Sequence, residues 1–330
     1  MRTAICDLVG IELPIIQAPM GSASCPTLAA AVSNAGALGM LALTWTKPAD
    51  VRNVIRETRK LTERPFGVNL ILDWPQEERL EICLEEGVRI ISLFFGNAIP
   101  FVERIHSAGA VACVTVGSAE DACAAVEGGI DFVVAQGWEA GGHVSGQVAT
   151  LPLVRTTVEA VAPVPVIAAG GIADGPGLAA VLVLGAAGAW IGTRFLVSQE
   201  AAIHSRFQEM LLASQETDTV FTELFDVGWP GRPHRVLRNE TVNIWEAAGK
   251  PPSGQRPGEG ELLGTSQSRG PIVRYQSTTP PADATGNIEA FSLFAGQSAG
   301  LLQDIQPAGD IVRDIANGAR LALSRFSEVI

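Results

Sequence analysis

The stretch that decides the fold is "DFVVAQGWEAGGHVSG", residues 131–146. Its first part is an unbroken apolar run, as expected for a strand that is buried on both faces of a parallel sheet. Directly after that run come an indole (Trp138), a carboxylate (Glu139), an imidazole (His143) and four glycines. Many α/β enzymes keep their chemistry at the end of such a strand. The stretch therefore predicts either an active-site loop or a glycine-rich turn.

Seven further apolar runs of the same kind recur along the chain. They cover residues 14–20, 37–43, 66–72, 90–96, 110–117, 165–171 and 188–194. The segments between them are amphipathic, and several open with Ser, Asp or Pro and close with Gly, as capped helices do. Eight alternating units of this kind predict an α/β protein with a closed (β/α)8 TIM barrel. An open doubly wound sheet is the alternative, but its GxGxxG fingerprint is absent after the first run.

The β/α rhythm stops after residue 205. We interpret residues 1–215 as the barrel, 216–305 as a smaller, mainly helical lid or substrate lobe, and 306–330 as a helix that closes the barrel. Within the lobe, residues 250–287 are rich in Pro, Gly and Ser. That composition predicts an irregular, mobile segment.

Charge and composition exclude several classes of function. The 330 residues carry a formal net charge of -12, which opposes binding to nucleic acid or to an anionic membrane surface. No run is long enough to span a membrane, and the N-terminus lacks a secretory pattern, so a cytoplasmic location is expected. The five cysteines are scattered, without a CxxC pair, which predicts neither disulfides nor a metal site.

Unusual residues gather where the predicted strands end. A TIM barrel commonly binds phosphate in the loops after strands seven and eight, where the backbone approaches the anion. Gly170, Gly171 and Gly192 stand at those two positions, and Asp174 is placed to cap the following helix. The pairing of two glycine loops favours a phosphate site over simple turns.

Several motifs together resemble the nitronate monooxygenase family of FMN-dependent TIM barrels, namely "PIIQAPMG", "FGVNL", "QGWEAGGHVSG", "AAGGIADG", "GTRF" and "FAGQSAG". The resemblance covers essentially the whole chain and implies that FMN is the cofactor. The positions that match the family's flavin site are Ala18, Pro19, Met20, Asn69, Gln136, Gly141, Gly142, Gly170, Gly171, Gly192, Thr193 and Gln297.

The resemblance also implies that His143 is the catalytic residue. An imidazole suits this place because its ordinary pKa of about 6.5 allows proton transfer near neutrality. The implied reaction is the oxidation of alkyl nitronates, or of nitroalkanes, by O2 to a carbonyl compound and nitrite. The alternative function is that of an NAD(P)H-dependent enoyl-thioester reductase or an NADH:quinone reductase. The protein could also form a homodimer. For His234, within "GWPGRPHR", two interpretations stay open: it packs in the interior, or it lies over the active site.

Overall fold

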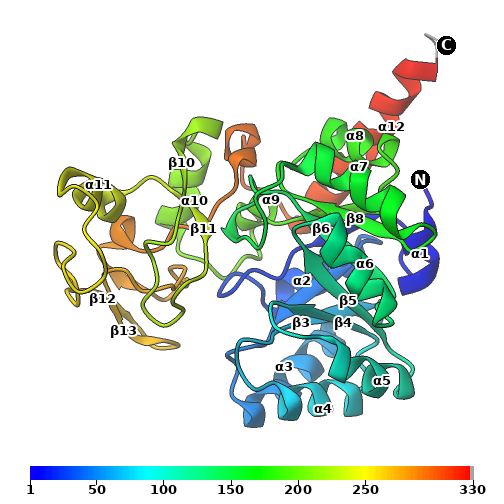
Figure 1. Cartoon of the computed structure of the whole chain (residues 1–330), viewed down its shortest axis with the longest axis horizontal. Helices are drawn as coiled ribbons and strands as arrows, with labels where there is room; N and C mark the ends of the chain where they lie inside the picture. Colours follow the sequence, from blue (N-terminus) through cyan, green and yellow to red (C-terminus); the bar gives the residue numbers. More distant parts are fainter. Residues whose placement is uncertain (328–330) are drawn as a thin grey trace.

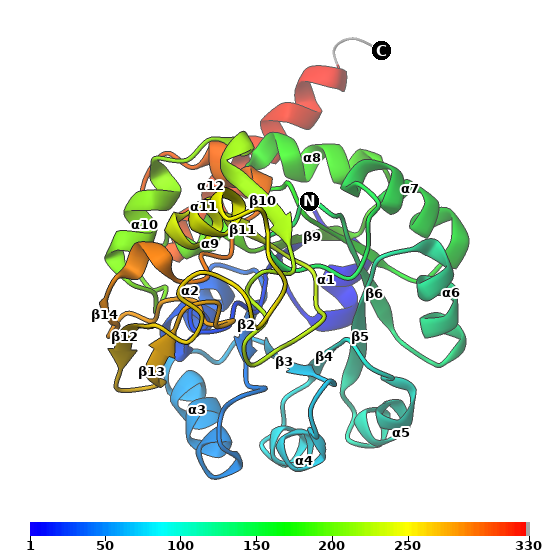
Figure 2. The same cartoon turned by 60° about the vertical axis from the view of Figure 1, so that its left-hand side comes forward.

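The computed structural model describes residues 1–327, and its larger part is a barrel of eight parallel strands (Figures 1 and 2). All eight predicted runs are strands. They are β1 (Ile15–Gln17), β2 (Gly39–Ala42), β3 (Phe66–Ile71), β4 (Ile90–Phe94), β5 (Val111–Val116), β6 (Phe132–Gln136), β8 (Val166–Ala169) and β9 (Gly188–Ile191). A parallel bridge between Ile16 and Leu38 joins β1 to the start of β2 and closes the ring. The predicted (β/α)8 barrel is confirmed.

Helices surround these strands, as the view nearly along the barrel shows (Figure 2). They are α2 (Pro26–Asn34), α3 (Pro48–Leu61), α4 (Glu77–Glu85), α5 (Ile99–Ser107), α6 (Ala119–Glu127), α7 (Thr150–Val161), α8 (Gly175–Val183), α9 (Thr193–Leu196) and α12 (Ala308–Ser327). The Asp174 side chain accepts a hydrogen bond from the Gly177 N–H at 2.8 Å, so the predicted cap of α8 is confirmed. Helix α12 packs against α8 and α2. The expected closing segment ends in residues 328–330, which lie outside the described residues.

Apolar packing holds the barrel inside and outside. The interior cluster includes Ile16, Phe132 and Ile167 of three strands. The short helix α1 (Ala4–Val9) adds Ile5 and Cys6 to the same cluster, so it plugs one end of the barrel. A larger cluster fills the layer between strands and helices. No helix in the described part of the chain is long and apolar enough to cross a membrane.

The remaining chain forms a lobe beside the barrel (Figure 1), and the expectation that it is mainly helical is wrong. Besides α10 (Ser205–Leu212) and α11 (Glu240–Ala247), it contains β10 (Thr219–Thr222), β11 (His234–Leu237), β12 (Leu262–Ser266), β13 (Gly270–Val273) and β14 (Thr285–Gly286). One sheet has the order β10-β11-β7, and β7 (Gly142–His143) comes from the loop after β6. Strands of two to five residues are too short to show a clear alternation of apolar and polar residues, so they could not be recognised from the sequence.

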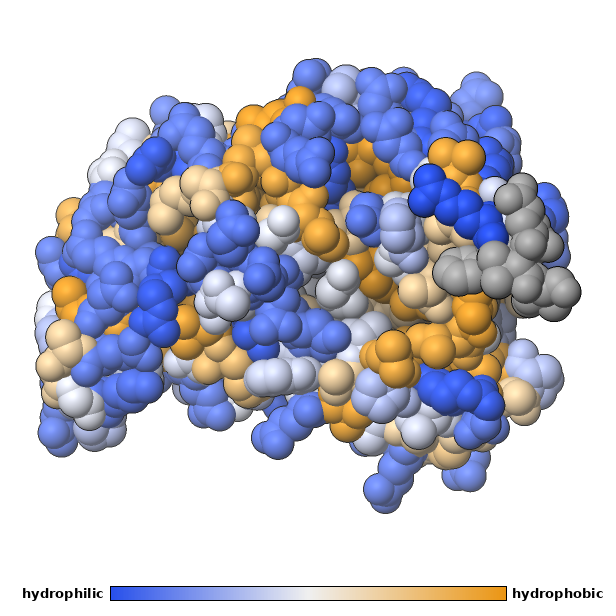
Figure 3. Space-filling view, turned by 90° about the horizontal axis from the view of Figure 1, so that it is seen from above, coloured by the Kyte–Doolittle hydropathy of each residue, from blue (hydrophilic) through white to orange (hydrophobic). Residues whose placement is uncertain are grey.

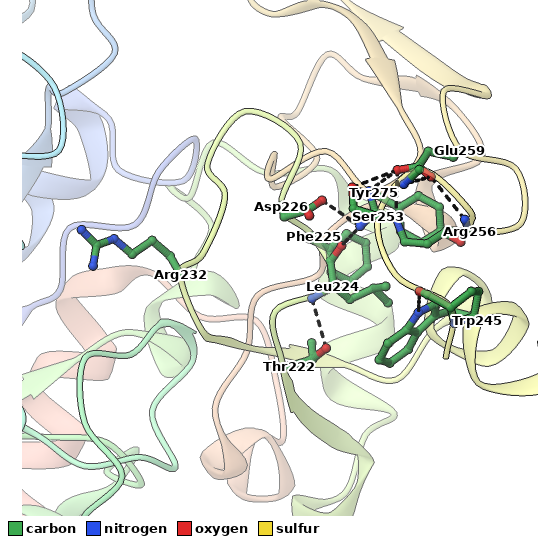
Figure 4. Close-up of polar contacts among 12 residues, drawn as sticks. Thr222, Leu224, Phe225, Asp226, Arg232, Trp245, Ser253, Arg256, Glu259 and Tyr275 are labelled. Atoms are coloured by element: carbon green, nitrogen blue, oxygen red, sulfur yellow. Dashed lines mark hydrogen bonds and ion pairs between the residues drawn. The ribbon is translucent and has the colours of Figure 1, made fainter. Parts of the chain in front are cut away.

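Residues 250–287 contain regular structure and buried anchors, so the expected irregular segment is wrong in that respect. The Arg256 side chain is only 3% exposed and forms ion pairs with Asp226, at 2.7 Å, and with Glu259 (Figure 4). Its guanidinium also lies over the Tyr275 ring, 4.3 Å from the centroid. The paired arginine thus anchors the segment together with the buried side chains of Leu263, Ile272 and Tyr275. The mobility of the segment stays a prediction.

The visible surface is mostly hydrophilic. On the face seen in Figure 3, hydrophilic side chains predominate, and smaller hydrophobic patches lie between them. Exposed apolar side chains include Val183 of α8 and Leu321 of α12, which are 72% and 62% exposed. Isolated apolar side chains of this kind are normal on a protein surface.

Candidate active site

A cavity of about 450 Å³ lies at the carboxyl ends of the barrel strands, where the lobe covers them. Its lining includes all but one of the residues predicted for the site: Ala18, Pro19, Met20, Asn69, Gln136, Gly141, Gly142, His143, Gly170, Gly171, Gly192 and Thr193. The exception is Gln297, whose N–H donates to the Glu139 carbonyl at 3.1 Å. Its neighbours Gly296 and Ser298 line the cavity in its place.

The buried side chain of Gln17 fixes the loop after β1 by hydrogen bonds. The Gln17 Oε1 accepts from the Met40 N–H at 3.0 Å, and its Nε2 donates to the Ser24 hydroxyl at 3.0 Å. That hydroxyl in turn accepts from the Met20 N–H at 2.9 Å. These bonds fix the backbone of residues 18–20 at the cavity wall.

Two amide side chains reach the cavity from the ends of β3 and β6. The Ser92 hydroxyl donates to the Asn69 Oδ1 at 2.9 Å and thereby orients that amide. The Gln136 Nε2 donates to the His143 carbonyl at 3.1 Å. Its Oε1 is buried and has no partner among the described residues. Because a buried acceptor without a partner is costly, this atom points to a bound ligand.

The two glycine loops are shaped differently. Gly170 and Gly171 have φ values of +104° and +71°, which favour glycine for backbone reasons. Gly192 has φ -104°. A Cβ at Gly192 would lie 3.6 Å from the Ala18 Cβ, which is an ordinary contact. The protein itself therefore does not require glycine there, and the free space faces the cavity.

The loop after β6 is held at both ends. The Glu139 carboxylate accepts from the Thr150 N–H, at 3.1 Å from each oxygen, and so caps the start of α7. Gly141 packs on Gly296, because a Cβ at Gly141 would lie 2.4 Å from the Gly296 nitrogen. The Gly296 N–H donates to the Thr193 hydroxyl at 3.0 Å. Glu139 thus shapes the loop.

His143 lies at the centre of these contacts. It pairs with His234 across the β7–β11 ladder, and its ring centroid is 3.8 Å from that of Trp229. The His143 Nε2 is buried without a partner in the described chain. Burial lowers the pKa of His143 well below 6.5, and the charges of His234 and Arg232 lower it further. The imidazole is therefore neutral at pH 7 and able to accept a proton.

His234 packs behind His143 and does not line the cavity. The Phe225 N–H donates to the His234 Nε2 at 3.2 Å, and the Nδ1 is 2.9 Å from the Arg232 carbonyl. Burial lowers the pKa of His234 to about 4. With one ring nitrogen accepting and the other donating, His234 holds a fixed neutral tautomer behind His143.

Asp73 of the barrel binds Trp229 and Arg232 of the lobe, and this clamp was not predicted from the sequence. The Asp73 carboxylate accepts from the Trp229 Nε1 at 2.8 Å and from the Arg232 Nε at 2.7 Å. Burial raises the pKa of Asp73, but the hydrogen bonds from Arg232 and Trp229 outweigh this and keep it below its usual value. Asp73 directly follows the predicted run 66–72, so its place at the end of a strand was a signal that could have identified it.

Aromatic rings form the wall around this clamp. The Trp229 ring contacts those of Trp45 and Trp74, with centroids 5.7 and 5.0 Å apart. Arg232 lies over the Phe95 ring at 4.4 Å, and Phe294 packs 5.2 Å from His143. Such a wall limits the access of water to the imidazole, and it explains why the pKa of His143 is depressed.

Comparisons with known proteins agree with this architecture. The model of the family described as "Nitronate monooxygenase" matches residues 2–78 and 75–318. The chain is 33% identical to a Pseudomonas aeruginosa protein named "Nitronate monooxygenase", over 97% of this chain and 100% of that one. It is also 33% identical to a Rhodococcus jostii protein named "(3aS,4S,5R,7aS)-5-hydroxy-7a-methyl-1-oxo-octahydro-1H-indene-4-carboxyl-CoA dehydrogenase", over 97% and 96% of the two chains.

A solved structure shows the same likeness. FabK from Thermotoga maritima superposes with a TM-score of 0.87 at 35% identity, and each chain is covered completely. The family match extends over barrel and lobe alike. The chain is therefore an oxidoreductase that belongs to the nitronate monooxygenase family.

Proposed function

We propose that this protein is an FMN-dependent enzyme that oxidises alkyl nitronates, and the nitroalkanes from which they form, with O2 to a carbonyl compound and nitrite. The observation that carries the proposal is His143, a neutral imidazole with a free Nε2 in an aromatic-walled cavity. Family membership supports oxidation of this substrate class.

The residues around the cavity fit FMN. Three buried polar atoms without partners in the described chain belong to cavity-lining residues: the Gln136 Oε1, the His143 Nε2 and the Ser277 Oγ. Gly192 leaves space that the protein does not use. The glycine loops after β8 and β9 would hold the phosphate, and Asn69 and Gln136 would bind the ring system. When bound, FMN would accept the electrons of the substrate and pass them to O2.

The chain's own contribution is proton transfer and exclusion of water. The His143 Nε2 would take the proton from the carbon next to the nitro group, because the ring is neutral and can accept a proton at this nitrogen. Trp229, fixed by Asp73, keeps the imidazole desolvated. A preformed nitronate has already lost that proton, so it would need His143 only for binding and orientation.

The test is to load the purified protein with FMN and to measure nitrite release from a nitronate and from its parent nitroalkane. The proposal expects a bound flavin spectrum and nitrite that is formed in step with O2 consumption. If the loaded protein oxidised neither substrate, nitronate oxidation would be excluded. If it retained no flavin at saturating FMN, the cofactor assignment would be wrong as well.

A second candidate function is redox chemistry on an acyl thioester. The Rhodococcus jostii relative, named as a CoA dehydrogenase, favours it. The same His143 would then act on a carbon next to a thioester carbonyl, which is also acidic. Oxidation of NADH or NADPH with an enoyl thioester or a quinone, measured beside nitrite release, separates the candidates. Turnover of one substrate class alone would decide between them.

A further inference from the structure

Arg269 is a cation without a counterion at the solvent-facing edge of the cavity. It sits in the turn between β12 and β13, is exposed, and lines the cavity. Within residues 1–327, its guanidinium has neither a carboxylate nor a hydrogen-bond acceptor. Three other arginines of the lobe, Arg232, Arg256 and Arg274, each pair with at least one carboxylate. Unlike these three arginines, Arg269 has no carboxylate partner among the described residues.

This difference is not explained by a shortage of acids. The chain has 35 acidic residues and 23 Lys and Arg. The lobe is rich in carboxylates, and Asp283 lies close enough to the same turn to accept from the Ser268 N–H at 3.2 Å. That carboxylate is used to hold the turn, and it does not pair with the guanidinium. The cationic end is therefore left free toward the cavity.

Polar side chains surround the same edge. Ser277, Thr278 and Thr279 line the cavity together with Arg269. The Ser277 Oγ is buried and has no partner in the described chain. Although the residue as a whole is exposed, the surrounding protein partly desolvates its guanidinium and lowers the pKa of Arg269 from its usual value, but the group stays charged at neutral pH. A guanidinium and an unpartnered hydroxyl that line the same cavity are groups that recognise phosphate oxygens.

We propose that Arg269 and Ser277 form an anion subsite that binds a phosphate group of the second substrate. The flavin phosphate has its own cradle at the glycine loops of β8 and β9, so this subsite would serve another molecule. Two sources carry suitable phosphates, a coenzyme A thioester and a nicotinamide dinucleotide such as NADPH. The inference rests on the proposed function only in taking the cavity as the flavin site.

The test measures direct binding to the FMN-loaded protein by calorimetry, with CoA, NADPH and pantetheine as probes. Pantetheine lacks the nucleotide phosphates of CoA. The variants are Arg269→Gln, Arg269→Lys, and Arg206→Gln as the matched control. Arg206 is also a lobe arginine, but it pairs with Glu289 at the surface, with 48% of its side chain exposed. FMN affinity is measured in every variant by flavin fluorescence.

We expect Arg269→Gln to weaken binding of CoA, NADPH or both by about 10- to 100-fold, the value of a lost charge-assisted contact. Arg269→Lys should recover part of the affinity, and Arg206→Gln should bind like the wild type. The probe that loses affinity identifies the source of the phosphate, and pantetheine binding should not change.

Three results would overturn the subsite. The wild type could bind neither CoA nor NADPH, or Arg269→Gln could bind both like the wild type. Arg269→Gln could instead lose FMN affinity alone, in which case the arginine belongs to the flavin site. If the protein bound no FMN at all, that result would contradict the proposed function but not the subsite. The CoA and NADPH titrations can be carried out on the flavin-free protein and would still test the subsite.

Discussion

The barrel and the lobe meet at one cavity but are held together by different forces. In the barrel, strands such as β6 contribute fully buried apolar residues, and Phe132 and Val134 are inaccessible to solvent. In the lobe, a small apolar cluster that includes Phe225 and Tyr275 is joined by buried charges. Arg256 and Arg274 are buried, and each pairs with two carboxylates. Buried ion pairs therefore add to apolar packing in fixing the geometry of the lobe.

The two parts also give the cavity different groups. The barrel supplies backbone loops and the amides of Asn69 and Gln136, which suit a cofactor. The lobe supplies Trp229 and Arg269, and its strand β11 pairs with the loop that carries His143. The comparison teaches that the barrel forms the part of the cavity where we propose a cofactor binds, whereas the lobe surrounds the imidazole and forms the outer edge of the cavity.

The largest expected effect is on the stability of the lobe. Arg256→Met would leave the Asp226 and Glu259 carboxylates without their buried partner, and we expect a loss of about 3 kcal/mol in the free energy of unfolding. The surface variant Arg206→Met should lose less than about 1 kcal/mol. Urea unfolding followed by tryptophan fluorescence compares the two. Equal losses would contradict the view that buried charges hold the lobe.

His143→Asn should separate binding from chemistry. Asparagine keeps a polar group of similar size but cannot take the proton, so turnover of a neutral nitroalkane should fall by about 100-fold or more. FMN binding should persist, because the flavin would be held mainly by barrel groups. Steady-state rates with the nitroalkane and with its preformed nitronate distinguish two roles. A smaller loss with the nitronate identifies a base, whereas undiminished rates with both substrates remove His143 from the mechanism.

Gly192→Ala tests the barrel side of the cavity. The added methyl group meets only ordinary contacts in the protein, so the stability should change by less than about 1 kcal/mol. FMN affinity should fall by about tenfold, since the space is needed by the ligand. The comparison variant is Gly171→Ala, where φ is +71° and a side chain strains the backbone as well. Unchanged flavin affinity in Gly192→Ala would place the phosphate elsewhere.

The smallest expected effect is a shift in pH dependence. Protonation of His143 removes the base, so the rate falls as the pH drops through its pKa, and burial places that loss well below pH 6.5. Trp229→Ala would admit water, raise the pKa and move the acid limb of the profile to higher pH. Trp229→Phe keeps an aromatic ring against the imidazole, so the acid limb of the profile should move less. A profile that is identical in all three proteins would show that the lobe does not tune His143.

The sequence by itself determined the barrel, because each of its strands is a continuous apolar run that local periodicity reveals. It also placed most of the predicted site at the cavity, since every parallel strand directs its carboxyl end to the same face. Gln297 is the exception: it lies beside the cavity because its N–H is bound to the loop at Glu139. That displacement depends on a contact between segments far apart in the chain.

Only the tertiary structure decided the lobe and its contribution to the site. The pairing of β11 with β7 and the clamp of Asp73 on Trp229 join residues more than 90 positions apart. Neither contact leaves a periodic pattern, because short strands and single side chains acquire their partners through folding of the whole chain. The lowered pKa of His143 is of the same kind. The sequence shows that a histidine is present at this position. The desolvated environment that keeps its imidazole neutral forms only when the barrel and the lobe pack together.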